Sequence, residues 1–222
     1  PEFLPTSGRG ILFLDEINMA PPAIQGIAQQ LILDRRVGSY KVPEGWFIWG
    51  AGNRKEDFAS VFDMPAPLAN RFIHVEASTN LEEFKEYALN RKIDDKIISF
   101  LKYRPNLLHK VDKNSPAWPS PRSWETANQL LGGELDIDPA VGEGAAGEFR
   151  SFVKVYKSLP SIEGILSGKI KPDFPEDLSA RYALTVALSL RAKNISEIKH
   201  AFLYLEEKAH LEWLTQCAYD VT

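Results

Sequence analysis

Short runs of consecutive apolar residues distinguish the first third of the chain. Residues 11–14 (ILFL) and 46–49 (WFIW) are apolar without alternation, which is typical of strands buried on both faces of a parallel sheet. Residues 73–75 (IHV) predict a third strand. Between the first two strands, residues 21–22 (PP) open a predicted helix, because proline is accepted in a first helical turn. The apolar residues of this helix recur at helical spacing: Ile24, Ile27, Leu31 and Ile32.

A β-rich segment precedes the strand at 46–49. Residues 37–42 (VGSYKV) combine β-forming residues with a glycine, and residues 43–45 (PEG) carry a turn signal. We interpret this segment as a short hairpin or an insertion ahead of the strand.

The apolar period becomes helical from Ser78 onward. Thr79 or Asn80 can cap the first helix, and residues 108–121, with three prolines, predict a loop. The predicted helices cover approximately residues 80–90, 94–103, 122–131, 141–159, 178–190 and 195–217.

The chain is therefore predicted to be α/β, with two parts. An α/β region over residues 1–78 precedes an all-helical region over residues 79–222. The helices between residues 149 and 219 are rich in Trp and Phe, which form either the core of this region or a docking face.

Charge and composition exclude several classes of protein. The 222 residues hold 26 Lys and Arg against 30 Asp and Glu, a net charge of −4, so no overall positive field attracts nucleic acid or anionic lipid. No apolar run approaches the ~18 residues of a membrane span. The single Cys217 cannot form an internal disulfide, and no signal peptide is visible. We therefore expect a cytoplasmic protein without a membrane partner, and nucleic acid is disfavoured.

Two adjacent carboxylates, Asp15 and Glu16, end the strand at 11–14. The carboxyl ends of strands are where open α/β sheets bind ligands, and neighbouring strand residues point to opposite faces. A divalent cation such as Mg²⁺ with phosphate oxygens relieves the repulsion between two such charges. Asp15 would then hold the metal, and Glu16 would orient and deprotonate a water molecule. Alternatively, both are turn residues that cap the next helix.

Asn53 ends the second apolar strand in the same way. Its amide can donate to a phosphate oxygen and accept from a water molecule, which suits a sensing role beside Glu16. The alternative is a left-handed turn residue after Gly52.

Two arginines are candidates for phosphate contacts. Arg71 lies in a short turn before residues 73–75 and could reach a phosphate on another subunit, or could pair on the surface with Glu76 or another acid. Arg122 falls in the first turn of a helix, where the helix dipole disfavours a cation. A bound anion would explain Arg122, and so would a solvated side chain beside Glu125.

These elements, in this order and at these separations, resemble the AAA+ ATPases, and specifically their MoxR-like branch, over roughly residues 8–131. The matching motifs are a Walker B strand at 11–16 (ILFLDE) extended by 17–22 (INMAPP), sensor one at Asn53, an arginine finger within 69–72 (ANRF), and sensor two within 120–122 (SPR). The resemblance implies a partial P-loop NTPase sheet followed by a helical lid domain. It also implies that residues 37–45 belong to a hairpin facing a central pore.

The resemblance assigns a role to each candidate residue. Asp15 would coordinate Mg²⁺, Glu16 would be the general base, Asn53 would position the water, Arg71 would act in trans on the γ-phosphate of a neighbour, and Arg122 would contact the nucleotide. ATP and Mg²⁺ are the implied cofactors. The implied activity is ATP hydrolysis by a self-associated ring, typically a hexamer, that remodels or matures a protein client. Residues 50–54 (GAGNR) depart from the Thr-Gln-Asn-Pro form usual in this branch.

No Walker A loop, G-x-x-x-x-G-K-[ST], occurs in the sequence. Residues 164–170 (GILSGKI) have one residue too few between their glycines and lack the Ser or Thr, so we interpret them as a lid loop. Without that loop the two carboxylates leave a triphosphate site net negative, and we expect no tight ATP binding by this chain alone. We also expect that Pro1 is not the natural start and that the chain is a fragment. Its sheet would be patched by another copy, by a rearranged strand, or left with a gap.

Two other functions stay open. A scaffold or adaptor could keep the fold without turnover, and ATPase measurements on a Glu16→Gln variant separate it from the enzyme. A DNA-remodelling relative within AAA+ is disfavoured by the net charge of −4 and by the lack of a basic, aromatic-containing stretch.

Overall fold

The computed structural model describes residues 4–54 and 61–221. These residues form two compact units, one ending at Ala77 and one beginning at Ser78. No helix in the described ranges combines the length and the apolarity that crossing a membrane requires.

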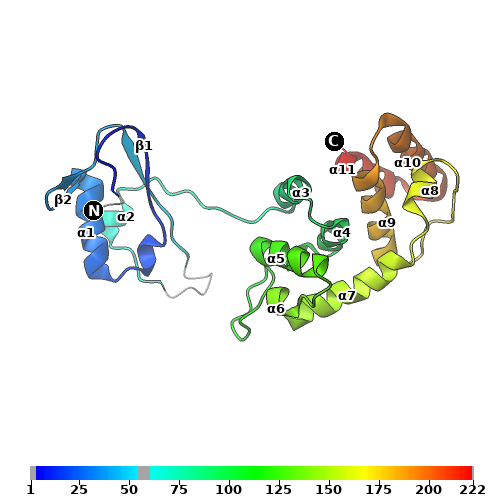
Figure 1. The fold of residues 1–222 in the computed structure, drawn as a ribbon, viewed down its shortest axis with the longest axis horizontal. Coiled ribbons are helices and arrows are strands. Elements are labelled where there is room, and N and C mark those ends of the chain that lie inside the picture. Colours follow the sequence, from blue (N-terminus) through cyan, green and yellow to red (C-terminus); the bar gives the residue numbers. More distant parts are fainter. Residues whose placement is uncertain (1–3, 55–60, 222) are drawn as a thin grey trace. The chain divides into compact units, whose positions relative to one another are not determined.

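The first unit is a small α/β arrangement (Figure 1). Its elements are β1 (Gly10–Leu14), η1 (Ile17–Met19), α1 (Pro22–Asp34), β2 (Arg36–Val37), β3 (Tyr40–Lys41), β4 (Trp46–Gly50) and α2 (Ala66–Ala69). β1 pairs with β4 in parallel, and β2 pairs with β3 in antiparallel fashion. The two predicted apolar strands, the helix between them and the short hairpin are thereby confirmed.

The predicted burial of both sheet faces is wrong. Ile11 lies opposite Phe47 and Phe13 lies opposite Trp49 in the β1–β4 register. These four side chains are between 46% and 71% exposed. Side chains alternate between the faces of a sheet, so all four lie on the same open face. The side chains on the other face, those of Leu12, Leu14, Trp46 and Ile48, are half-buried.

The predicted third strand is also wrong. Residues 73–75 form no strand, and the side chains of Ile73 and Val75 are 95% and 88% exposed. A strand exists through hydrogen bonds to a neighbour. Within the described part of the chain, β1 and β4 pair only with each other, so residues 73–75 have no strand to pair with.

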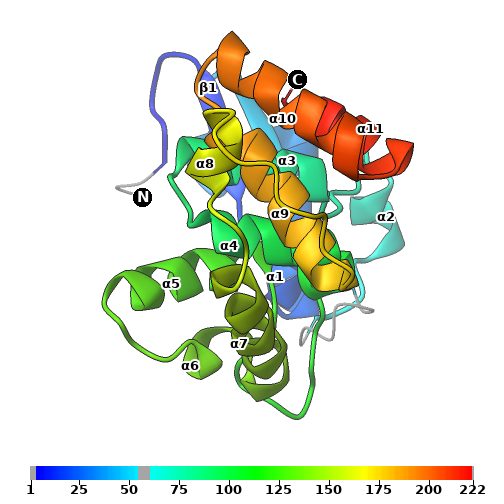
Figure 2. The ribbon, with the colours of Figure 1, turned by 90° about the vertical axis from the view of Figure 1, so that its right-hand side faces the viewer.

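The second unit is all-helical (Figures 1 and 2). Its elements are α3 (Leu81–Asn90), α4 (Asp95–Tyr103), η3 (Pro105–Leu107), α5 (Pro121–Gly132), α6 (Asp138–Val141), α7 (Glu143–Lys157), α8 (Ile162–Leu166), α9 (Leu178–Arg191), α10 (Ile195–Lys208) and α11 (Leu211–Val221). The side chain of Asn80 caps α3 and that of Asp94 caps α4. α9 contacts α4, α7, α8, α10 and α11, and is the central helix of the unit.

The single helix predicted over residues 195–217 is wrong. The chain forms α10 and α11 instead, because Ala209 takes an extended backbone conformation (φ −120°, ψ 169°) that ends α10. Neither glycine nor proline occurs at this break, so the sequence carries no ordinary signal for it.

Aromatic side chains form the centre of the second unit. The ring of Phe100 lies 5.4 Å from Phe149, 5.5 Å from Phe152 and 5.6 Å from Trp124, measured between centroids. These four residues and Trp213 are buried. Of the two alternatives for the aromatic-rich helices, these residues therefore form the core.

Candidate functional site

The end of β1 presents both predicted carboxylates to solvent. Asp15 follows β1 directly, and its Oδ1 accepts a hydrogen bond from the Glu16 N–H at 3.0 Å. Glu16 takes the left-handed conformation (φ 51°, ψ 39°), which costs a residue other than glycine roughly 1 kcal/mol. Among the described residues, the Glu16 carboxylate has no hydrogen-bond or ion-pair partner. The strained turn thus leaves this carboxylate available to solvent.

Backbone hydrogen bonds attach this turn to the end of β4. The Ala51 N–H donates to Leu14 O at 3.0 Å, and the Ile17 N–H donates to Ala51 O at 2.9 Å. Ile17 is buried. The backbone on both sides of Glu16 is therefore held against the segment that leads to Asn53.

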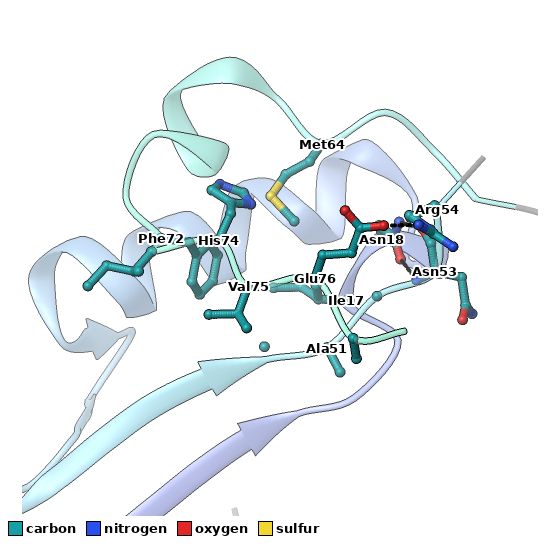
Figure 3. Close-up of a pocket in the computed structure, with 14 residues that line it drawn as sticks. Ile17, Asn18, Ala51, Asn53, Arg54, Met64, Phe72, His74, Val75 and Glu76 are labelled. Carbon is teal, nitrogen blue, oxygen red and sulfur yellow. Dashed lines mark hydrogen bonds and ion pairs between the residues drawn. The ribbon is translucent and has the colours of Figure 1, made fainter. Parts of the chain in front are cut away.

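Asn18 connects the two strand ends a second time (Figure 3). Its Nδ2 donates to Asn53 O at 2.6 Å, and the Asn53 N–H donates to Asn18 Oδ1 at 3.2 Å. A Cβ atom at Gly52 would lie 2.5 Å from Asn18 Oδ1, so this approach requires the glycine. The backbone of Asn53 is fully engaged, and its side-chain amide has no hydrogen bond to a described residue.

A cavity of about 770 Å³ lies beside these residues. Residues 50–54 line it from one side and residues 72–77 from the other. Figure 3 shows Arg54 and Glu76 pointing toward one another from these two segments, and their side chains form an ion pair. Asn53 lines the cavity, whereas Asp15, Glu16 and Arg71 do not.

Arg71 projects from a turn that α2 anchors. Leu68, in α2, is fully buried, and the Arg71 guanidinium donates to Pro67 O in the same turn. Glu76 pairs with Arg54 instead, so the alternative Arg71–Glu76 pair is not formed. Arg71 is exposed and has no acidic partner among the residues that the structure describes.

Arg122 belongs to the second unit, in the first turn of α5. Ser120 and Ser123 cap this helix reciprocally, so Arg122 is not needed as a cap. Glu125 accepts a hydrogen bond from the Tyr87 hydroxyl at 2.9 Å, and Arg122 is exposed. Over residues 4–54 and 61–221, no ion pair between Arg122 and Glu125 is formed.

Protein-family models, curated proteins and solved structures give no match to this chain.

The exposed carboxylates fit one type of metal site. The described ranges contain no group of three or more His, Cys, Asp or Glu side chains that could hold a metal ion. Mg²⁺ needs fewer protein ligands, because it keeps several waters and is bound through one or two carboxylates together with substrate phosphates. Asp15 can supply such a carboxylate, because its Oδ2 is left unused by the local turn.

The sequence segment nearest to a Walker A loop does not form a cradle for a triphosphate. The nearest sequence candidate, residues 164–170, forms the end of α8 and the following turn. There the N–H groups of Ser167, Gly168 and Lys169 donate to backbone carbonyls. Phosphate cradles need such N–H groups free. The prediction that this segment is not a Walker A loop agrees with this geometry, although part of it is helical.

Sequence reasoning assigned no role to Asn18 or to the Arg54–Glu76 pair. In the sequence, Asn18 stands out only as a member of residues 17–22, which extend the resemblance to a Walker B strand. Gly52, directly before Asn53, was an available signal, because a glycine next to a strand end often marks a close approach of another group. The partner of that approach cannot be read from local sequence, since it lies 35 residues away.

Proposed function

We propose that the first unit carries the hydrolytic part of the ATP site in a ring-forming, MoxR-like AAA+ ATPase that remodels or matures a protein client. The observation that most supports this proposal is that hydrogen bonds join the end of β1 to the end of β4. Glu16 follows β1 and Asn53 follows β4, and four hydrogen bonds connect these two strand ends. The Ala51 N–H donates to Leu14 O, the Ile17 N–H donates to Ala51 O, and two bonds join Asn18 and Asn53.

The chemistry assigns a separate task to each polar side chain. When bound, Mg²⁺ neutralises charge on the nucleotide phosphates. Asp15 would hold this ion with its carboxylate. Glu16, unpaired within the described structure, accepts the proton of an attacking water. Asn53 orients this water, because its amide both donates and accepts.

The two arginines extend this proposal beyond one subunit. Arg71 and Arg122 are exposed and lack an acidic partner within the described residues. A guanidinium is always charged and matches phosphate geometry. Arg71 would act on the γ-phosphate held by a neighbouring subunit, which is the reason to propose a ring, and Arg122 would contact the nucleotide.

A second candidate is a scaffold or adaptor with this fold and no turnover. The observation that favours it is the engagement of the N–H groups of residues 167–169, which leaves this segment without a phosphate-binding role. Such a protein would bind partners through the same units and release no phosphate.

Measuring phosphate release by the full-length protein tests the two candidates. Glu16→Gln removes the proton acceptor and keeps the size of the side chain, so we expect the rate to fall about a hundredfold or more. Asp34→Asn is the control, because Asp34 is an exposed acid of the same unit at the end of α1. Equal rates for Glu16→Gln and wild type would reject the enzyme and favour the scaffold.

A further inference from the structure

Asn18 contacts two described residues that follow β4 in the sequence, Asn53 and Phe62. Its side chain holds the backbone of Asn53 through two hydrogen bonds, at 2.6 and 3.2 Å. Its backbone carbonyl accepts a third, from the Phe62 N–H at 2.8 Å. The residues at both ends of the intervening segment are therefore attached to one residue of η1.

The side chain at position 18 must offer a donor and an acceptor together. The N–H and C=O of Asn53 form a complementary pair, and the carboxamide of asparagine matches both groups. A carboxylate accepts only, so an aspartate would face Asn53 O without a donor.

Gly52 is the second part of this arrangement. Its φ lies outside the left-handed range, so an alanine could adopt the same backbone conformation. The obstacle to alanine is the side chain of Asn18, whose Oδ1 and Cγ would lie 2.5 and 2.9 Å from the added Cβ. An alanine at position 52 should therefore displace the Asn18 carboxamide.

We infer that Asn18 is a positioning residue: it fixes the backbone of Asn53 relative to the turn that carries Glu16, and leaves the Asn53 side chain to contact water and phosphate. This inference rests on the proposed function. Asn18 touches neither water nor nucleotide in this scheme, and acts through Asn53 alone.

The first test compares two variants of the full-length protein in steady-state ATP hydrolysis. Misplacing a group that orients a reactant costs roughly tenfold to a hundredfold in rate. We expect Asn18→Ala and Asn18→Asp to lower kcat by about this factor at neutral pH, with KM for ATP unchanged. The ratio of the Asn18→Asp rate to the Asn18→Ala rate should rise as the pH is lowered, because a protonated carboxyl can again donate to Asn53 O. A merely structural defect would give no such rise.

The second test uses the collision at Gly52. Gly52→Ala should lower kcat as much as Asn18→Ala does, and the double variant should be no slower than Asn18→Ala alone. Gly26→Ala is the matched control, because a Cβ added at this position of α1 meets nothing within 4 Å. Hydrogen exchange at the Asn53 amide should speed up in Asn18→Ala and in Gly52→Ala, but not in Gly26→Ala.

The outcomes separate this inference from the proposed function. If Glu16→Gln loses turnover and Asn18→Ala keeps the kcat of the wild type, the positioning role is overturned and the ATPase stands. The positioning role would also be overturned if the fold-loss of kcat in the Gly52→Ala/Asn18→Ala double variant equalled the product of the fold-losses in the two single variants. If Glu16→Gln hydrolyses ATP at the rate of the wild type, the proposed function fails, and the inference about catalysis fails with it.

Discussion

The two units differ in the burial and the pairing of their charged side chains, and in the burial of their large apolar side chains. In the second unit, the Lys85 and Lys102 ammonium groups both contact the carboxylate of Asp220, and all three residues are buried. In the first unit, Asp15 and Glu16 are exposed and unpaired with any described cation, and four large apolar side chains lie on an open sheet face.

This difference distinguishes charged residues that stabilise the fold from charged residues that are available to bind a ligand. Lys85, Lys102 and Asp220 of the second unit satisfy one another's charge, so these three residues contribute to folding and are not free to bind a ligand. The first unit leaves polar groups unpaired at strand ends, which is where ligands bind in α/β sheets. The candidate hydrolytic residues therefore lie in the less completely packed unit.

We expect the largest effect on the rate of ATP hydrolysis from Arg71, because the proposal has its guanidinium act on the nucleotide of a neighbouring subunit. We expect Arg71→Ala to lower ATP hydrolysis by the full-length protein by about a thousandfold or more, as for arginines that act in trans. Mixing Arg71→Ala with the Glu16→Gln variant should restore part of the activity, because each subunit then supplies the group that the other lacks. A mixture as inactive as its components would argue against action in trans.

Removing Asp220 tests the internal pairing of the second unit. Asp220→Ala would leave Lys85 and Lys102 with only the half-exposed Glu82 carboxylate as a counter-charge, 3.9 and 3.5 Å away. We expect it to lower the free energy of unfolding by about 3 kcal/mol. Denaturant titration measures this loss. Glu206→Ala, at an exposed position of α10, should change stability by no more than about 0.5 kcal/mol. Equal effects of the two variants would contradict the pairing.

Asp95 makes the second unit sensitive to acid. Burial raises its pKa, but hydrogen bonds from Arg191 Nε (2.6 Å) and Tyr156 Oη (2.8 Å) outweigh this, so that the pKa is lowered below its usual 3.8. A lowered pKa in the folded state stabilises the protein above pH 3.8, and this contribution is lost as the pH falls through the folded-state pKa. Unfolding curves between pH 2 and 6 should therefore show a smaller loss of stability in acid for Asp95→Asn than for the wild type. Parallel losses would contradict this linkage.

The smallest effect should come from the open sheet face. Phe47 is 71% exposed, so Phe47→Ala should cost less than about 1 kcal/mol. Phe149, which is 2% exposed, is the matched residue of the second unit, and Phe149→Ala should cost about 3–5 kcal/mol. Thermal unfolding of both variants measures the contrast. Comparable costs would show that the face at Phe47 is covered.

Local sequence predicted the helices that are determined by neighbouring residues, through caps and apolar periodicity. Asn80 and Asp94 cap helices, and the apolar periods of the helices that follow them are visible without the structure. A run of apolar residues at 11–14 predicted a strand, but could not show that Ile11 and Phe13 would be exposed, since burial depends on elements elsewhere in the chain.

The candidate site was predictable in its residue types and not in its connections. Asp15, Glu16 and Asn53 stand out because polar residues end apolar strands. The hydrogen bonds from Asn18 to Asn53, and the Arg54–Glu76 pair, join residues distant in sequence. The strand predicted at residues 73–75 is wrong for a related reason. A strand needs a neighbouring strand to pair with, and local sequence does not show whether one is present.

The identity of the nucleotide that remains bound after gel filtration tests the central claim most directly. The full-length wild type and the Glu16→Gln variant are each incubated with ATP and Mg²⁺, separated from free nucleotide, and their bound nucleotide is analysed by chromatography. We predict ADP with the wild type and unhydrolysed ATP with Glu16→Gln. ADP on both proteins, or no nucleotide on either, would contradict the assignment of Glu16 as the proton acceptor of an ATPase.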